Sequence, residues 1–275
     1  MTSQAEYWNE AGGAAWVRGQ ALLDAQLAPV GALALDAAAA KPGEAALDVG
    51  CGCGATTADL AAAVGPNGRV VGVDLSAPMI VRAREWVAAP QVEFKVGDAA
   101  SVALPGRAFD LLFSRLGVMF FDEPVRAFAH LRTALRPGGR VSLAVWQSIE
   151  ANPWLAVPMA SVAGLVELPA LGGPDEPGPF SFAAQERVET LLGAAGFGDV
   201  ALTGHIVDLA IGGGLALDGA VGCTIEHGPL RRVLEPAPPP VRAAATERIA
   251  AALAPYDGPN GVHLPAGVWV VTASA

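Results

Sequence analysis

The segment Leu47–Gly54, with the sequence LDVGCGCG, constrains this chain more than any other. It is typical of a buried strand that ends in a glycine-rich turn and runs directly into a helix. Three glycines in five residues let the backbone turn sharply, and they let a ligand approach the main chain without meeting a Cβ atom. The first turn of the helix would offer free N–H groups and the positive end of its dipole. The segment therefore predicts a site for an anionic or polar nucleotide-like ligand.

This turn alone fits two classes of ligand. Gly50 and Gly52 match the dinucleotide pattern G-x-G-x-x-G/A, and together with Gly54 they match the E/D-x-G-x-G-x-G pattern of S-adenosylmethionine (SAM) sites. A second apolar strand over 69–74 ends in Asp74, whose carboxylate can bind both ribose hydroxyls of an adenosine. Both ligands contain that ribose, so Asp74 predicts an adenosine without choosing between them.

The following segments continue the alternation of strands and helices. A strand over 92–96 leads into the sequence GDA at 97–99, where a carboxylate can accept a hydrogen bond from the adenine amine. A fourth strand is expected over 109–114, and a fifth over 141–146 after the sequence LRPGG at 135–139. This alternation predicts a parallel sheet with helices on both faces.

The succession of motifs from Leu47 to Trp146 resembles the class I SAM-dependent methyltransferases, in particular the small-molecule branch near the ubiquinone and menaquinone C-methyltransferases. The resemblance rests on five ordered motifs, among them DVGCG at 48–52, DLSAPM at 74–79 and LRPGG at 135–139. It implies a doubly wound, Rossmann-like α/β sheet of seven strands, six parallel and the last antiparallel. It also implies SAM as cofactor, S-adenosyl-L-homocysteine as product, and in-line methyl transfer to an oxygen, nitrogen or carbon atom of a small molecule.

Outside this core the pattern predicts additional helical parts. We expect residues 1–40 to form an N-terminal helical lid and residues 41–275 to form the methyltransferase domain. Proline-containing helical segments at about 150–182 and 212–260 predict two cap insertions in that domain. The second insertion stands between the last two expected strands, where the family has a short hairpin. Substrate specificity is expected to reside there.

The resemblance assigns the cofactor contacts to residues of the motifs. Asp74 would bind the ribose, Asp98 would bind the adenine amine, and Asp48 would orient the turn and the amino group of the ligand. The full expected set of cofactor-binding residues is Asp48, Gly50, Cys51, Gly52, Asp74, Leu75, Met79, Gly97, Asp98, Ala99, Ser114, Arg115 and Trp16.

Several candidates also have a purely structural interpretation. Trp16 and Tyr7 can cover the pocket or pack the N-terminal helix on the core. Arg115 can bind a carboxylate of the ligand or form a surface salt bridge. His227 is the best candidate for a catalytic base, since the insertions overhang the site, although a single histidine is more often structural. Four aromatic residues can form pocket walls or core: Phe120, Phe121, Trp146 and Trp154.

Composition limits the partners and the compartment. A net charge of −10 disfavours nucleic acid and anionic membrane surfaces. The sequence CGC at 51–53 has no second Cys/His pair at ligand spacing, so no metal is expected. We see neither a signal peptide nor a stretch of about 20 apolar residues. We therefore expect a cytoplasmic protein with a small-molecule substrate, no nucleic-acid partner, no membrane insertion and possible homodimers.

Two other functions stay open. An NAD-dependent oxidoreductase shares the glycine turn and Asp74, but the motifs at 97–99 and 135–139 and the lack of a Tyr-x-x-x-Lys pair disfavour it. A non-catalytic SAM-binding protein would use the same fold for regulation or assembly. A lack of obvious acid–base residues does not count against methyl transfer, because the cofactor itself carries the activated group.

Overall fold

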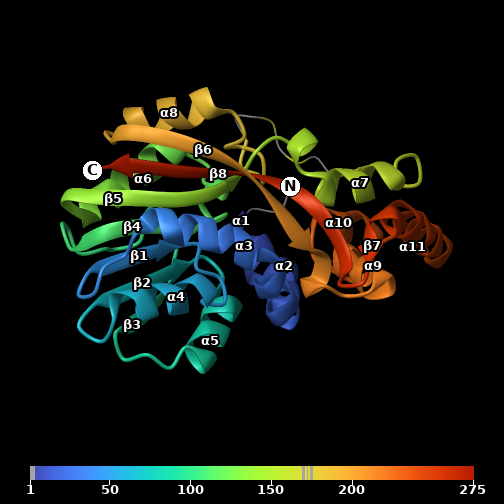
Figure 1. Cartoon of the computed structure of the whole chain (residues 1–275), viewed down its shortest axis with the longest axis horizontal. Helices are drawn as coiled ribbons and strands as arrows, with labels where there is room; N and C mark the ends of the chain where they lie inside the picture. The colour runs from blue at the N-terminus through green and yellow to red at the C-terminus, as the bar shows by residue number, and fades with distance from the viewer. Residues whose placement is uncertain (1–3, 169–170, 172, 174–175) are drawn as a thin grey trace.

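The computed structural model describes residues 4–168, 171, 173 and 176–275. Across these residues, the main sheet follows the strand order β3-β2-β1-β4-β5-β8-β6 (Figure 1). The strands are β1 (Ala45–Val49), β2 (Arg69–Asp74), β3 (Val92–Val96), β4 (Phe109–Arg115), β5 (Leu135–Trp146), β6 (Gly198–Ala210) and β8 (Gly261–Ser274). The two-residue β7 (Asp257–Gly258) pairs with β8.

The directions of the strands confirm the predicted sheet. Strands β1 to β5 pair in parallel, whereas β8 is antiparallel to both β5 and β6. Strand β6 therefore points the same way as the first five, which makes six parallel strands and one antiparallel strand. The chain order reverses between β1 and β4, so the carboxyl ends of these strands flank the crevice where doubly wound sheets bind ligands.

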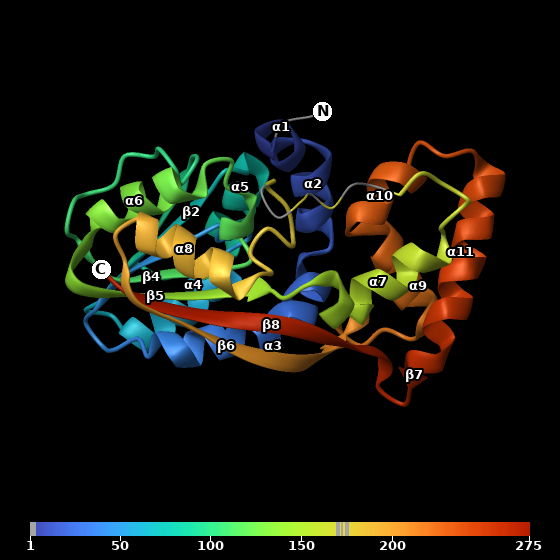
Figure 2. The same cartoon turned by 90° about the horizontal axis from the view of Figure 1, so that it is seen from above.

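Helices cover both faces of the sheet (Figure 2), as the apolar strands require. Helices α3 (Gln20–Ala38) and α4 (Ala55–Val64) lie on one face, and α6 (Pro124–Ala134) and α8 (Gln185–Ala194) lie on the other. Helix α5 (Ala77–Trp86) packs against β2 and β3. Short 3-10 helices connect the elements at Val118–Phe120, Ile149–Ala151, Ile211–Gly213 and Ala254–Tyr256.

Helix α3 is part of the core, which differs from the expected lid over residues 1–40. Val30 and Ala34 are fully buried, and the Ser142 hydroxyl on β5 donates to the Ala34 carbonyl at 2.7 Å. Of the expected lid, α1 (Gln4–Asn9) and α2 (Ala11–Arg18) lie over the ends of the strands; residues 1–3 are outside the described part. The apolar side chains of α3 pack against the sheet, and this packing explains why α3 belongs to the core and not to a lid.

Helix α3 also corrects the expectation that no segment is long and apolar enough to span a membrane. By length and composition Gln20–Ala38 passes that test. In the structure its polar side chains have specific partners. Arg82 on α5 donates to Gln20 at 2.7 Å, and the Gly212 N–H donates to Gln26 at 2.8 Å. These contacts are those of a core helix.

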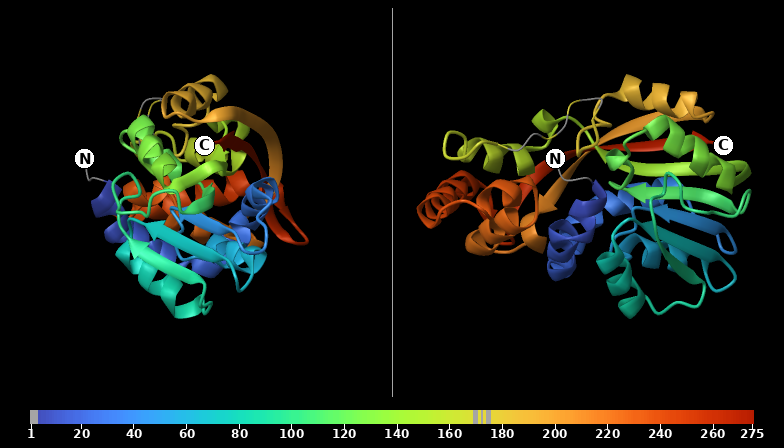
Figure 3. Two further views of the ribbon diagram at one scale, coloured as in Figure 1. Left: turned by 90° about the vertical axis from the view of Figure 1, so that its left-hand side faces the viewer. Right: turned by 180° about the vertical axis from the view of Figure 1, so that it is seen from behind.

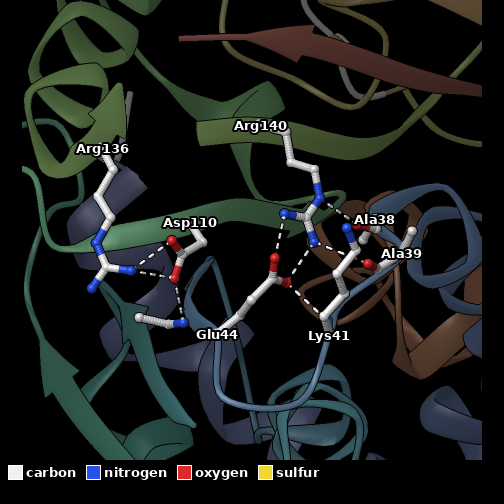
Figure 4. A network of polar contacts seen from close by, with 8 residues as sticks. Ala38, Ala39, Lys41, Glu44, Asp110, Arg136 and Arg140 are labelled. Carbon is white, nitrogen blue, oxygen red and sulfur yellow. Dashed lines mark hydrogen bonds and ion pairs between the residues drawn. The ribbon is translucent and has the colours of Figure 1, made fainter. Parts of the chain in front are cut away.

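Ion pairs fix the amino ends of the strands, at the edge of the sheet opposite the glycine-rich turn (Figure 4). Arg140 on β5 pairs with Glu44 at 2.7 Å and donates to the Ala38 carbonyl at the end of α3 at 2.6 Å. Arg136 pairs with Asp110 on β4 at 2.6 Å. The network joins α3, β4, β5 and the segment before β1, so this edge serves the fold and leaves the opposite edge for a site.

The remaining helices form one cap beyond the sheet. Strands β6 and β8 continue past the sheet as a long ribbon that leads to the cap (Figures 2 and 3). The cap helices are α7 (Pro153–Ser161), α9 (Leu217–Glu226), α10 (Pro229–Leu234) and α11 (Pro239–Leu253), and α11 packs against both α7 and α9. Both expected insertions contribute to it; residues 169–170, 172 and 174–175 of the first are outside the described part.

Candidate cofactor and acceptor pocket

The glycine-rich turn adopts a backbone that favours glycine. Gly50, Gly52 and Gly54 have φ angles of +68°, +55° and +88°, in the left-handed region. A Cβ atom on Gly50 would lie 2.6 Å from the Cα of Gly117, so no larger residue fits there without moving the backbone. A Cβ on Gly52 would meet no atom closer than 3.7 Å, and this side of the turn is open to the cavity.

Asp74 joins the turn to the end of β2. Its Oδ2 accepts a hydrogen bond from the Gly52 N–H and its Oδ1 accepts one from the Ser76 N–H, both at 2.8 Å. Burial raises the pKa of Asp74, and these N–H groups oppose the shift. Each carboxylate oxygen can accept a second hydrogen bond. Asp74 therefore keeps acceptor capacity for a hydroxyl-bearing ligand in the cavity that it lines.

A cavity of about 340 Å³ runs along the carboxyl ends of the central strands. This volume is typical of small-molecule sites. The structure brings twelve of the predicted site residues to its wall, namely Trp16, Gly50, Cys51, Gly52, Asp74, Leu75, Met79, Gly97, Asp98, Ala99, Arg115 and His227. Two predicted contacts, Asp48 and Ser114, are not among the residues that line it.

Asp48 lies beneath the turn and is not among the residues that line the cavity, so its contact with the ligand stays a prediction. Its Oδ2 accepts hydrogen bonds from the hydroxyls of Thr56 at 2.8 Å and Thr57 at 2.6 Å, in the first turn of α4. Its Oδ1 is buried and has no partner in the described part of the chain. Burial raises the pKa of Asp48 to about 6, against the two threonine hydrogen bonds. The carboxylate thus holds the start of α4.

Ser114 and Arg115 end β4 and point to different surroundings. Ser114 is fully buried, and its hydroxyl donates to the Val49 carbonyl at 2.7 Å, so it joins β4 to β1 where a ligand contact was expected. Arg115 lines the cavity and also pairs with Asp24 on α3 at 3.5 Å. The Arg115 side chain is only 11% exposed. This pair is therefore an inner contact and differs from the surface salt bridge considered from the sequence.

Six aromatic side chains also line the cavity, and their part of the wall is here called the aromatic end: Tyr7, Trp8, Phe120, Phe121, Trp146 and Trp154. The Trp8 ring packs edge-on against Trp16 at 6.0 Å and against Phe120 at 5.8 Å between ring centres. The rings of Trp146 and Trp154 lie 5.2 Å apart. Trp16 also lies beside Gly52, so the aromatic wall reaches from the glycine turn to the cap.

Trp8, which the sequence analysis did not single out, has a central place in this wall. Its carbonyl accepts a hydrogen bond from the Ser76 hydroxyl at 2.6 Å, at the start of α5. The signal was present in the pair YW at 7–8, followed by Trp16 at helical spacing. Helix α10 closes over these residues, because the Arg232 guanidinium lies 3.9 Å from the centre of the Tyr7 ring and Arg231 donates to the Ala11 carbonyl.

His227 follows α9 and lines the cavity beside the cap. Its side chain is 5% exposed, and its Nδ1 is buried without a hydrogen-bond partner among the residues described. A Cβ atom on Gly19 would collide with the imidazole ring, so the glycine makes room for it. Burial lowers the pKa of His227, and Arg18 and Arg231 add to this effect while Glu226 opposes it. The imidazole is therefore neutral at pH 7.

The cysteines of the turn are buried thiols. Cys51, Cys53 and Cys223 are free, and burial raises the pKa of each. Over the described ranges no group of three His, Cys, Asp or Glu side chains is placed to hold a metal ion. Cys51 and Cys53 thus act as small apolar residues of the turn.

Comparisons with known proteins agree with this geometry. A family model described as a methyltransferase domain matches residues 46–139. A nocamycin O-methyltransferase from Saccharothrix syringae is 39% identical over 119 residues, which cover 42% of this chain and 42% of that protein. A demethylmenaquinone methyltransferase from Bacillus cytotoxicus is 36% identical over 104 residues, which cover 37% and 44%. The chain therefore matches less than half the length of these relatives.

The fold also matches a solved structure over most of its length. The YcgJ protein from Bacillus subtilis superposes with a TM-score of 0.57 at 15% identity, over 89% of this chain and 97% of that one. At this identity the likeness concerns the fold. The sequence match spans β1 to the start of β5, which carry the glycine turn, Asp74 and Asp98. Residues 46–139 therefore match a methyltransferase domain, and the relatives that share this segment include a demethylmenaquinone methyltransferase and an O-methyltransferase.

Proposed function

We propose that this protein transfers the methyl group of SAM to a small-molecule acceptor by in-line displacement. The observation that carries the proposal is a single cavity with two different ends. One end has the open glycine turn and the Asp74 carboxylate, and the other is lined by six aromatic side chains. The first end suits an adenosine with a charged tail, and the second suits an apolar or planar molecule.

The residues present fit SAM at the nucleotide end. Asp74 would accept hydrogen bonds from the ribose hydroxyls, and Asp98 would accept one from the adenine amine. Leu75 and Met79 would flank the adenine ring, and the backbone at Gly50 and Gly52 would face the ribose and the methionine part. The fit is supported by the free acceptor capacity of Asp74 and by the open side of Gly52.

When bound, SAM supplies a methyl group on a positively charged sulfur that leaves as a neutral thioether. The protein has to align the acceptor with that methyl group and to exclude water. Trp16 lies between the glycine turn and the aromatic end, and an aromatic face is a favourable neighbour for a cation. The contacts of α10 with Tyr7 and Ala11 close the cavity above both ligands.

The relatives support a small acceptor. The names of the nocamycin O-methyltransferase and the demethylmenaquinone methyltransferase describe acceptors that are small organic molecules. The net charge of −10 also opposes binding of a nucleic acid. We therefore propose a small, apolar or aromatic acceptor that binds beneath the cap.

The test is the thermal unfolding shift with SAM, S-adenosylhomocysteine and NADH. A ligand at 100 times its Kd stabilises the native state by about 2.7 kcal/mol. We expect shifts with the first two ligands, which Asp74→Asn reduces strongly and the exposed Asp257→Asn leaves unchanged. A shift with NADH alone would contradict the proposal. Binding of SAM without methylation of any acceptor in a broad panel would favour the non-catalytic SAM-binding alternative.

A further inference from the structure

Two residues that line the cavity, Gln4 and His227, each have a buried side-chain atom without a hydrogen-bond partner in the described part of the chain, and only the histidine can act as a base at neutral pH. Nδ1 of His227 is buried and has no hydrogen-bond partner in the part of the chain that the structure describes. A buried polar atom without a partner destabilises a fold by about 1–3 kcal/mol. Such atoms in native proteins call for an explanation. The position of His227 on the cavity wall indicates that the missing partner is a ligand.

The surroundings of the ring favour an unprotonated Nδ1. Its other nitrogen, Nε2, lies 3.9 Å from a carboxylate oxygen of Glu226, and a neutral ring with its proton on Nε2, on the side of this negative charge, leaves Nδ1 as an acceptor. The charged groups that act on the ring are Glu226 from α9, Arg18 from α2 and Arg231 from α10. Burial, with a smaller contribution from the two cations, keeps the ring neutral before reaction, and Glu226 stabilises it once it carries a second proton.

We propose that His227 accepts the proton of an aromatic or enolic hydroxyl, so that the acceptor is a planar hydroxylated compound methylated on oxygen. This inference rests on the proposed function. The ring of the acceptor would lie against the aromatic end, where Trp8, Trp146 and Trp154 offer apolar faces. Its hydroxyl would donate the hydrogen bond that Nδ1 lacks.

The charges and atoms of the step balance. The O–H bond of the acceptor breaks, and its proton moves to Nδ1. An oxygen electron pair forms the new bond to the methyl carbon, and the electron pair of the carbon–sulfur bond leaves with the sulfur. The imidazole gains the positive charge that the sulfur loses. Glu226, near Nε2, supports this imidazolium in the way that a carboxylate orients a catalytic histidine.

Other titratable groups at this end suit the role less well. The Glu226 side chain is 75% exposed, so water already solvates its carboxylate. The Tyr7 ring lies under the Arg232 guanidinium. Arg231 and Arg232 have no lone pair with which to accept a proton. Of the histidines, His227 lines the cavity, whereas His130 bonds to the Val102 carbonyl and His263 pairs with Asp208.

The first experiment measures binding of three hydroxyarenes, phenol, 2-naphthol and 9-phenanthrol, to protein saturated with S-adenosylhomocysteine. We expect at least one to bind about tenfold more tightly than its methyl ether, because the ether cannot donate a hydrogen bond to Nδ1. The substitution His227→Asn, which keeps a small polar side chain, should reduce this preference. His205→Asn on β6 is the matched control, since His205 lies outside the cavity lining.

The second experiment measures methyl transfer to the same hydroxyarenes and to 2-naphthalenethiol, which is largely ionised at pH 8 and needs no base. The substitution His227→Asn should lower kcat for the hydroxyarene about 10²- to 10⁴-fold at pH 7. The loss should shrink as the pH approaches about 10, where a phenol ionises unaided. Transfer to the thiol should change less than about threefold, because its ionised form requires no proton acceptor.

The outcomes separate the possible failures. An equal loss for hydroxyarene and thiol would give His227 a structural role and overturn the inference. So would a cofactor-loaded protein that binds and methylates none of the three hydroxyarenes. If the wild-type protein binds neither SAM nor S-adenosylhomocysteine, the proposed function itself fails, and that result is visible before any acceptor is added.

Discussion

Asp48 gives the sharpest test of the reasoning, because its burial makes a measurable contribution to stability. The carboxylate is fully buried, accepts two threonine hydrogen bonds on one oxygen and leaves the other oxygen unpartnered in the described part of the chain. Burial raises its pKa in the folded protein to about 6, against 3.8 for an ordinary aspartate. Asp48→Asn removes the charge and keeps one oxygen for the threonine hydroxyls.

The size of the effect follows from proton linkage. The folded state binds more protons than the unfolded state between these two pKa values, so the free energy of unfolding falls as the pH rises through this window. Relative to an uncharged side chain, the carboxylate costs nothing below about pH 3.8. Above about pH 6 it costs the full difference between the two pKa values, about 3 kcal/mol. Between pH 5 and pH 8 the change is about 1 kcal/mol.

The assay is urea unfolding followed by tryptophan fluorescence, for which the chain has six tryptophans. The unfolding free energy of Asp48→Asn minus that of the wild type should rise by about 1 kcal/mol from pH 5 to pH 8. A buried amide group without a partner would lower the variant's stability by a constant amount, which cancels in this comparison. Asp257→Asn, an exposed control on β7, should show a difference below about 0.5 kcal/mol at both pH values. A flat difference for Asp48→Asn would refute the claim that burial controls this carboxylate.

Two further predictions concern the turn and the closure of the cavity. Gly50→Ala should lower the free energy of unfolding in urea by about 3 kcal/mol, because the cost of a left-handed φ and the cost of a Cβ clash with Gly117 add up. The control Gly43→Ala should lower it by about 1–2 kcal/mol, because Gly43 has a φ of +85° but no atom near its Cβ position. Similar losses for both would contradict the close approach of Gly50 and Gly117. Tyr7→Leu removes the contact with Arg232 and should speed amide exchange in α1 and α2, measured by mass spectrometry. The control Tyr256→Leu, at an exposed residue in the 3-10 helix after α11, should not. Unchanged exchange in Tyr7→Leu would show that α1 and α2 are held by other contacts.

The sheet and the nucleotide end of the cavity were predictable because their signals are local. Each strand of the core carries its own apolar run, and the glycine turn, Asp74 and Asp98 each stand directly after a strand. In a parallel sheet these positions meet at one edge. Cys51, Leu75 and Met79 followed from the same motifs. The predicted start of β5 was less accurate, because pairing with β4 begins at Leu135 and resumes at Arg140 after an irregularity.

The other differences between the expected and the observed surroundings of residues have one physical cause. Burial depends on contacts between segments that are distant in the sequence. Asp48 and Ser114 stand at strand ends, as the lining residues do. However, threonine hydroxyls of α4 donate hydrogen bonds to the Asp48 carboxylate, and the Ser114 hydroxyl donates to the Val49 carbonyl of β1. Helix α3 precedes the first strand in the sequence, which suggested a lid. However, Ser142 and Gly212, which are more than 100 residues away along the chain, donate hydrogen bonds to this helix. Periodicity within one segment contains no information about such partners.

The two ends of the cavity therefore differ in how the chain builds them, and this has a consequence for substrate choice. The nucleotide end comes mainly from residues 50–117, within the segment 46–139 that the methyltransferase family model matches. The aromatic end takes Phe120 and Phe121 from that segment, whereas Tyr7, Trp8, Trp146 and Trp154 lie outside it, as does His227. Relatives that share the matched segment thus share the part that suits SAM, while the residues proposed to bind the acceptor belong to the helices around it. A change of acceptor should accordingly require substitutions in α1 and the cap, and should leave the affinity for SAM nearly unchanged.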